Sequence, residues 1–397
     1  MLEVVSAPVI RLPKELYAAP GLECNVYFGN VLFSVTPWCY AMQGESPVGR
    51  SERERWTFLP TEADAGKRYP LVINAWTDDG LAASATTVVR VASSVRKGSD
   101  RIAVALFGDS LTNCRWQDRV YEVMRMRGLN GYSPVGARRS ENPDVMYDGY
   151  GGFTFETFLE RYGFAEDEIS SVQDKAEREQ MLALGTPKKM ANERQRDLLK
   201  SPILRFENGK KILDVRGWME RVNGGTEPDV ILILLGVNGI FHLKGEVGEL
   251  RKWIRENRMP QAQRFLDALR KEMPHAQYCF LDPITGCSQD GFAANYGAGC
   301  NKVQYMKIVL AFDLELDDFV MRQNDGKIRM VPFAYGIDPV HGYLEREVPA
   351  NAHCDVLVRR QDNAIHCSTS GGKQLGDVVA SWFLCNWEGL KEAKSNE

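Results

Sequence analysis

A serine hydroxyl directly follows an apolar run in the first half of the chain. Ser110 lies within Gly108-Asp-Ser-Leu-Thr112, immediately after the largely aliphatic residues 102–107. Such a run, broken by glycine, predicts a buried strand that ends abruptly, and ligands bind at the carboxyl ends of strands in open α/β sheets. Ser110 is therefore a candidate nucleophile. The alternative interpretation is that Ser110 or Thr112 caps a following helix.

A serine attacks an ester only when a base takes its proton and hydrogen-bond donors stabilise the oxyanion that forms. The chain has five histidines, at positions 242, 275, 341, 353 and 366. Two have a suitable partner three residues earlier: Asp338 precedes His341, and Asn363 precedes His366, with Asp362 one position further back. This spacing lets a side-chain oxygen hold an imidazole across one turn, so both histidines are candidate bases.

Two glycine-rich loops can supply the donors. Residues 148–154 read Asp-Gly-Tyr-Gly-Gly-Phe-Thr, where glycine lets a backbone N–H approach a reacting carbonyl. Gly236-Val-Asn238-Gly239 follows an apolar strand that ends at Leu235, which places the Asn238 amide at the same sheet edge as Ser110. Each loop alone is a common turn, and their order on successive strand ends is the informative feature.

Taken in order, the blocks 108–112, 149–154 and 236–238 and the late His366 resemble the SGNH (GDSL) hydrolases. These are serine esterases with a flavodoxin-like α/β/α sandwich, and the resemblance covers about residues 100–390. It implies Ser110 as nucleophile and His366 as base. It also implies an oxyanion hole made of the Ser110 N–H, the Gly152 N–H and the Asn238 side chain.

The resemblance favours His366 over His341, because residues 363–377 look like the final block of the family. The loop 337–343 then looks like a preceding loop that lines the pocket. On this interpretation Asp338, His341 and Asp109 are substrate-binding residues.

Three positions depart from the family pattern. Asn363 stands where an aspartate is usual, Gly239 replaces an aspartate after Asn238, and Cys367 replaces a frequent proline. The imidazole of His366 is therefore oriented by Asp362, by a main-chain carbonyl, or by Asn363 itself in the manner of a Cys-His-Asn arrangement.

Composition limits the partners. The 397 residues are 44% hydrophobic and 26% charged with a net charge of −4, which is typical of a soluble globular protein and does not indicate nucleic-acid binding. No apolar run approaches the ~20 residues of a membrane span. The N-terminus does not look like a signal peptide, so the chain is cytosolic or a trimmed exported form, with export favoured.

Nine cysteines without a C-x-x-C pair argue against a structural zinc site and against a fully paired disulfide framework. If the protein is exported, a disulfide bridge between Cys287 and Cys300 is an alternative. We expect no metal and no cofactor. The oligomeric state is left open.

The pattern along the chain predicts two domains, residues 1–97 and 98–391. Short β-branched and aromatic runs at 25–28, 31–35, 55–58, 69–76 and 85–91 predict a small immunoglobulin-like β-sandwich with a hairpin turn at 78–80. A polar linker at 92–100 follows. Strands at 102–107, 229–235, 277–282 and 328–334 then alternate with helices, including 262–273 and 372–384, and predict a parallel sheet. The charged stretch 165–199 predicts solvated helices over that sheet.

The functional hypothesis is a serine esterase that works through an acyl-enzyme. An immunoglobulin-like domain ahead of an SGNH domain resembles bacterial carbohydrate esterases, which implies an O-acetyl group on a glycan as substrate. Two alternatives stay open: a lipase-like or thioesterase activity on longer acyl chains, and a glycan-binding protein on a weakened esterase scaffold.

Overall fold

The computed structural model describes residues 8–93, 101–161, 203–207 and 210–395, together with Lys175 and Glu179. Most of the predicted linker 92–100 and nearly all of the charged stretch 165–199 lie outside these residues.

The larger part of the molecule is built on a parallel sheet. Its strands β10 (Ile102–Gly108), β11 (Tyr132–Val135), β17 (Val230–Leu234), β18 (Gln277–Leu281) and β19 (Ile328–Val331) lie in the order β11-β10-β17-β18-β19. In chain order this is 2-1-3-4-5, the arrangement of flavodoxin-like sheets. Beyond β11, β13 (Met146–Gly149) pairs parallel with the same edge of β10 and carries the short antiparallel β12 (Arg138–Arg139). The predicted mixed α/β class is confirmed.

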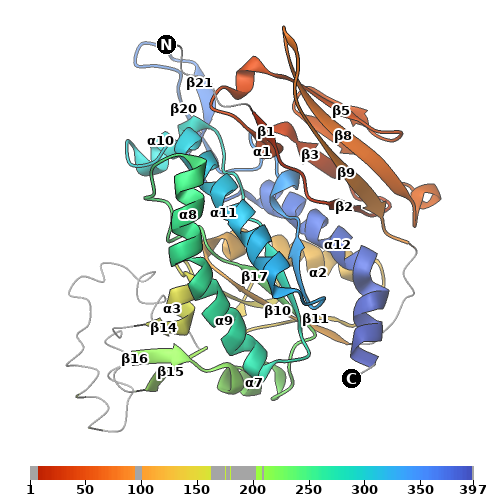
Figure 1. The fold of residues 1–397 in the computed structure, drawn as a ribbon, viewed down its shortest axis with the longest axis vertical. Helices are drawn as coiled ribbons and strands as arrows, with labels where there is room; N and C mark the ends of the chain where they lie inside the picture. Colours follow the sequence, from red (N-terminus) through yellow and green to blue (C-terminus); the bar gives the residue numbers. More distant parts are fainter. Residues whose placement is uncertain are drawn as a thin grey trace.

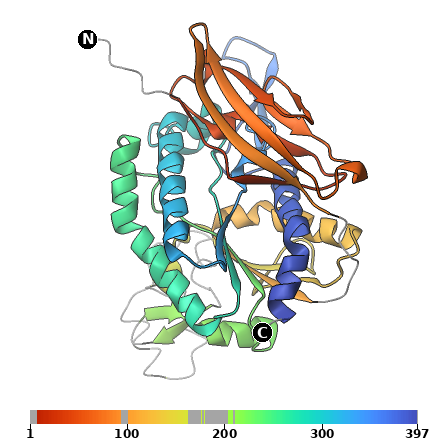
Figure 2. The ribbon, with the colours of Figure 1, turned by 45° about the vertical axis from the view of Figure 1, so that its right-hand side comes forward.

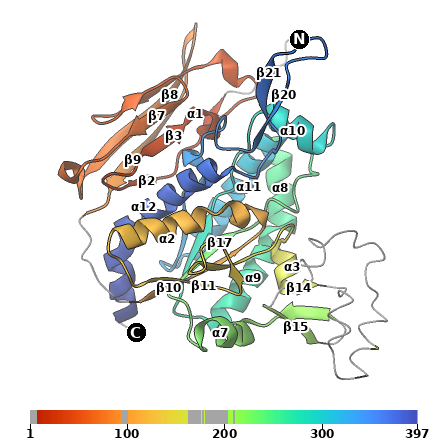
Figure 3. The ribbon, with the colours of Figure 1, turned by 180° about the vertical axis from the view of Figure 1, so that it is seen from behind.

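Helices cover both faces of the sheet, because the strands are apolar on both sides. In β10, Val104 and Leu106 belong to one buried cluster, whereas Ala105 and Phe107 belong to the other. The first face carries α2 (Trp116–Met126) and α12 (Thr369–Ser395), which lie across the sheet in Figure 3. The opposite face carries α3 (Phe155–Leu159), α7 (Val215–Asn223), α8 (Val247–Asn257) and α9 (Met259–Glu272), seen from the front in Figure 1. The long α11 (Lys302–Gln323) contributes to both clusters.

The predicted strand 328–334 is three residues too long. Pro332 has no N–H to continue the ladder. The next two N–H groups, of Phe333 and Ala334, donate to the carboxylate of Asp282 at 2.5 and 3.2 Å instead of to a neighbouring strand. The chain therefore leaves the sheet at Val331.

The N-terminal part is made of two sheets around one core. One sheet has the order β2 (Glu15–Ala18), β9 (Gly80–Val91), β8 (Arg68–Thr77) and β5 (Ala41–Glu45); the other has β3 (Cys24–Tyr27), β7 (Arg55–Phe58) and β6 (Arg50–Ser51). The predicted hairpin turn is confirmed, because Thr77 pairs with Gly80 across β8 and β9. The immunoglobulin-like type of this unit stays a prediction.

The predicted strand 31–35 is wrong for most of its length. A helical turn, α1 (Phe28–Val31), leads into the two-residue β4 (Leu32–Phe33), which pairs with β1 (Val9–Ile10). The reason is tertiary: the buried Asn30 side chain donates to the carbonyls of Ala334 and Ile337 at 3.1 and 2.6 Å.

The two parts of the molecule share their cores. The buried cluster between the N-terminal sheets includes Tyr335 and Val378 from the α/β part, and the cluster under α12 includes Leu22 and Ala92 from the N-terminal part. Figure 2 shows the N-terminal strands lying against the end of the α/β part that carries α12. The division at residues 97 and 98 stays a prediction, and an apolar core runs across it.

Candidate active site

Ser110 begins a 3₁₀ turn, Ser110–Cys114, directly after β10. The turn is capped by Asp109, whose Oδ1 accepts a hydrogen bond from the Leu111 N–H at 2.9 Å. The Thr112 N–H and hydroxyl both donate to the Asp109 carbonyl, at 3.2 and 2.5 Å. The cap is therefore Asp109, not Ser110 or Thr112, and the Ser110 hydroxyl is left for another partner.

That partner is His366. Its Nε2 lies 2.8 Å from Ser110 Oγ, and its Nδ1 lies 3.0 Å from Asn363 Oδ1. Asn363 Oδ1 also accepts the main-chain N–H of His366 at 2.9 Å. A main-chain N–H can only donate, so the Asn363 atom at this position is its oxygen, and the Nδ1 that faces it carries the proton. Nε2 is then the unprotonated nitrogen and can accept the Ser110 proton.

The loop that carries Asn363 and His366 is held by hydrogen bonds to residues that follow β18 in the chain. The Cys287 thiol donates to the Asn363 carbonyl at 3.2 Å, and the Cys287 N–H donates to the Ala364 carbonyl at 2.8 Å. The Ala364 N–H donates to Asn295 Oδ1 at 2.6 Å. Cys287 and Cys300 are both free thiols, so the bridge considered from the sequence is not formed.

Asp338 and His341 lie in a loop that supports the loop of His366, and their role in substrate binding stays a prediction. Asp338 Oδ1 accepts the N–H groups of Val340 and His341, at 2.8 and 3.0 Å. The His341 side chain is 77% exposed, with its Nδ1 3.8 Å from Glu345. Among the described residues, no hydrogen bond or ion pair joins Asp338 or His341 to Ser110.

This supporting loop instead braces the loop of the base. The Ser368 N–H donates to the Gly342 carbonyl at 2.9 Å, and the Asp362 N–H donates to the Leu344 carbonyl at 3.0 Å. The main-chain N–H of Asp362 therefore faces the supporting loop, whereas the contact to His366 Nδ1 comes from Asn363.

Asn238 reaches the sheet edge beside Ser110, as its place after β17 predicts. Its Nδ2 donates to Asp109 Oδ2 and to the Phe153 carbonyl, both at 3.1 Å. The turn depends on Gly236, which has φ +132° and whose Cβ, if it had one, would lie 2.0 Å from the Phe312 ring. Only glycine fits this approach, so the position of Asn238 depends on it.

The loop with Gly152 follows β13 and is anchored by Asp148. This carboxylate is fully buried and accepts hydrogen bonds from the Tyr150 hydroxyl and from Trp218 Nε1, each at 2.8 Å. Burial raises the pKa of Asp148 to about 6, against the opposing effect of those two donors. Gly152 has φ +81°, and its α-carbon faces open space.

Asp109 lies beneath the nucleophile and is 1% exposed. One carboxylate oxygen accepts the Leu111 N–H and the other accepts the Asn238 amide. Burial raises the pKa of Asp109 to about 7. We therefore treat Asp109 as a positioning residue for two of the predicted site residues.

Sequence reasoning missed several supports of the site. Asp148 was visible as the first residue of the glycine-rich loop. Trp218, Cys287 and Asn295 carry no sequence signal for their contacts, because each comes from an element far along the chain.

Within the described residues, no cluster of three or more histidine, cysteine, aspartate or glutamate side chains has the arrangement to hold a metal ion. None of the described helices is both long and apolar enough to span a bilayer.

The comparisons with known proteins are remote. No protein-family model matches the sequence, and no curated protein matches it.

Several solved structures of carbohydrate esterases are similar in fold. A carbohydrate esterase of family 3 from Talaromyces cellulolyticus is 14% identical, with 73% of this chain and 99% of that chain covered and a TM-score of 0.40. A family two carbohydrate esterase from Clostridium thermocellum, in complex with cellohexaose, is 12% identical over 94% of both chains, with a TM-score of 0.34. Est24, a carbohydrate acetylesterase from Sinorhizobium meliloti, is 12% identical over 71% of this chain and 98% of that chain, with a TM-score of 0.34.

The fold and the site together define an α/β protein with serine, histidine and asparagine in one hydrogen-bonded series at the carboxyl edge of a parallel sheet.

Proposed function

We propose that this chain is a serine esterase of the SGNH type that removes O-acetyl groups from a carbohydrate through an acyl-enzyme. The observation that carries the proposal is the 2.8 Å contact between Ser110 Oγ and His366 Nε2. Nε2 is the accepting nitrogen because the Asn363 oxygen accepts the hydrogen bond that Nδ1 donates. A hydroxyl within hydrogen-bond reach of an accepting imidazole is the pairing that nucleophilic catalysis requires.

In the proposed reaction Ser110 Oγ attacks the ester carbonyl while its proton moves to His366 Nε2. The resulting imidazolium gives that proton to the sugar oxygen as the ester C–O bond breaks, so the sugar leaves as an alcohol and an acetyl group stays on Ser110. Water then attacks the acyl-enzyme and gives a proton to His366, which passes it to Ser110 Oγ as acetate leaves. Asn363 keeps the imidazole in the required tautomer throughout, because its Oδ1 accepts from Nδ1 in both protonation states.

The proposed oxyanion hole is the Ser110 N–H, the Gly152 N–H and the Asn238 amide. Both Asn238 N–H bonds are taken up by Asp109 and Phe153. When the substrate is bound, Asn238 can donate to the oxyanion only if one of its N–H groups leaves its present acceptor or is shared between that acceptor and the oxyanion. Asp109, whose carboxylate holds one of them, is the residue that controls this exchange.

The substrate class rests on the resemblance of the predicted domain order, an immunoglobulin-like domain ahead of an SGNH domain, to bacterial carbohydrate esterases. Acyl chain length tests it. Turnover of p-nitrophenyl acetate, butyrate and octanoate separates a deacetylase, with the highest kcat/KM on acetate, from a lipase-like enzyme with the reverse order. Acetate release from an O-acetylated polysaccharide such as acetylxylan then tests the carbohydrate portion.

The roles of the two residues are tested with Ser110→Ala and His366→Ala. We expect each to lower kcat by about 10³-fold or more, because nucleophile and base act as one unit. Wild-type protein should gain the mass of one fluorophosphonate adduct on Ser110. His341→Ala is the matched control and should keep wild-type turnover, since His341 is exposed and held by its own loop. Full activity of Ser110→Ala, or the absence of an adduct on folded wild-type protein, would refute the proposal.

A further inference from the structure

A cavity of about 810 Å³ lies between the N-terminal part and the α/β part. Its walls are the N-terminal segment from Arg11 to Tyr17, one face of α11, and the edge strand β19 with the loops beside it. The volume is within the range of small-molecule sites, roughly 300–1,000 Å³. Strand β19 lies three strand spacings from β10, which is about 14 Å across the sheet. None of Ser110, Gly152, Asn238 and His366 lines it.

Three side chains in the wall carry buried polar atoms without a hydrogen-bond partner of normal geometry among the described residues. They are Asp313 Oδ1, Tyr335 OH and Arg329 Nε. Asp313 and Tyr335 are only 8% and 3% exposed. Buried polar groups in folded proteins are nearly always paired, so unpaired atoms gathered around one cavity indicate that its occupant supplies the partners. Because the three include an acceptor, a donor and a hydroxyl, that occupant must both donate and accept.

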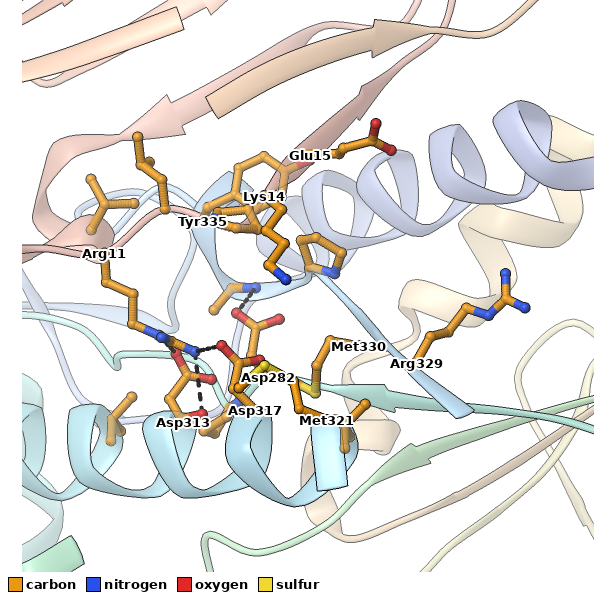
Figure 4. Close-up of a pocket in the computed structure, with 18 of the residues that line it drawn as sticks. Arg11, Lys14, Glu15, Asp282, Asp313, Asp317, Met321, Arg329, Met330 and Tyr335 are labelled. Carbon is orange, nitrogen blue, oxygen red and sulfur yellow. Dashed lines mark hydrogen bonds and ion pairs between the residues drawn. The ribbon is translucent and has the colours of Figure 1, made fainter. Parts of the chain in front are cut away.

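The charges in the wall argue against an anionic ligand. Figure 4 shows Asp282, Asp313 and Asp317 gathered near Arg11, with Arg329 apart from them beyond Met330. Arg11 is already paired with both Asp313 and Asp317. In all, five acidic side chains face three basic ones: Glu15, Asp282, Asp313, Asp317 and Asp325 against Arg11, Lys14 and Arg329.

Two further features of the wall favour a ligand that carries hydroxyl groups on a carbon ring. Burial, together with the neighbouring Asp313, raises the pKa of Asp282, so this carboxyl suits neutral hydrogen-bonding partners. The remaining wall is aliphatic, with Val309, Val320 and Met330 available to the C–H face of a ring.

We propose that this cavity is a second ligand site that binds a neutral sugar unit, remote from Ser110. The mixture of unpaired donors and acceptors, the acidic balance and the aliphatic wall together match a polyhydroxyl ring. Binding here involves no bond making or breaking and does not depend on esterase activity. The proposal therefore stands or falls separately from the proposed hydrolysis.

The test is isothermal titration calorimetry of the full chain carrying Ser110→Ala, which prevents turnover. The probes are D-xylose, D-glucose, N-acetyl-D-glucosamine, xylobiose and cellobiose, with glucose 6-phosphate and choline as charged comparisons. We expect at least one neutral sugar to bind saturably, and the phosphate and the ammonium probe to bind more weakly.

Tyr335→Phe locates the site, because it removes only a hydroxyl that makes no hydrogen bond of normal geometry to the described residues. We expect it to keep the thermal midpoint of unfolding and to weaken sugar binding about three- to tenfold, the range of one neutral hydrogen bond. The matched control is Tyr278→Phe, whose hydroxyl donates to the Met273 carbonyl at 2.7 Å away from the cavity. It should lower the midpoint and leave sugar affinity unchanged.

A crystal soaked with the tightest sugar should show it between Asp313 and Tyr335. The proposal is overturned if no neutral sugar binds, if choline or the phosphate binds more tightly than every neutral sugar, or if Tyr335→Phe and wild type bind equally. Sugar density only beside Ser110 would also overturn it, by placing all binding at the candidate active site.

Discussion

The side-chain oxygen of Asn363 lies 3.0 Å from His366 Nδ1 and 2.9 Å from the main-chain nitrogen of the same histidine. One amide oxygen thus fixes both the position and the tautomer of the imidazole. It supplies no negative charge to the imidazolium that forms during catalysis, which a carboxylate would.

Asn363→Asp should therefore increase the activity of an enzyme that already has the correct geometry. We expect kcat on p-nitrophenyl acetate to rise about tenfold at alkaline pH, because a carboxylate stabilises the imidazolium formed in the transition state. The same charge should move the acid limb of the kcat/KM profile to higher pH.

Asn363→Ala is the companion variant. It removes the oxygen altogether and should lower kcat by about 10²-fold or more, since the tautomer is no longer held. A pH–rate profile of Asn363→Asp that superimposes on the wild-type profile would show that Asn363 does not act on His366.

The Gly152 loop should depend on the hydrogen bonds to Asp148. Trp218→Phe removes one donor to this buried carboxylate, and we expect a loss of about 1–3 kcal/mol in the free energy of unfolding. If the loop supplies the oxyanion donor, kcat should fall while KM for p-nitrophenyl acetate changes little. A variant that loses stability but keeps the wild-type kcat at a temperature where it is folded would assign Asp148 a purely structural role.

Asp109 should make the protein less stable as the pH rises. The folded-state pKa of Asp109 is raised from 3.8 to about 7, so the stability linked to its protonated form is present below pH 4 and is lost as the pH rises through 7. The shift corresponds to about 4 kcal/mol if it is fully expressed.

Urea unfolding between pH 4 and 8 measures this effect, with Asp109→Asn as comparison. The stability of the variant relative to wild type should increase across that interval. A difference that stays constant with pH would mean that Asp109 does not titrate with an elevated pKa.

Arg11 should be essential to the attachment of the N-terminal segment. It pairs with Asp313 and Asp317 on α11, and the Asp313 side chain is only 11% exposed. Arg11→Met leaves a buried carboxylate without a counter-charge and should cost about 3–5 kcal/mol by urea unfolding. The double variant Arg11→Met, Asp313→Leu should recover much of that loss. If it does not, the interaction that was lost is one of packing.

The sequence was sufficient to predict the sheet, because its strands are near-continuous apolar runs such as residues 230–234, and their buried character is local information. It was also sufficient to place Ser110 and Asn238 at one edge, since parallel strands end on the same side. His366 follows no strand of the parallel sheet, so its role as base came from the family resemblance of residues 363–377, and its contact with Ser110 is a result of the fold.

What could not be predicted depends on distant partners. The helical turn at Phe28–Val31 exists because Asn30 binds carbonyls some three hundred residues away, and strand β19 ends where Asp282 takes the next N–H groups. His341 lies three residues after Asp338, which is the spacing of a base and its partner. In the structure, however, its loop accepts backbone hydrogen bonds from the loop of His366. Local spacing does not distinguish a catalytic loop from the loop that supports it.

Buried clusters that contain side chains from both the N-terminal part and the α/β part predict that the two parts unfold together. Tyr335 and Val378 are buried among N-terminal side chains, so a fragment that starts at residue 98 would expose them and leave Asp313 without Arg11. We therefore expect the N-terminal part not to fold as a transferable module. We expect heat or urea to unfold the whole chain in one cooperative transition.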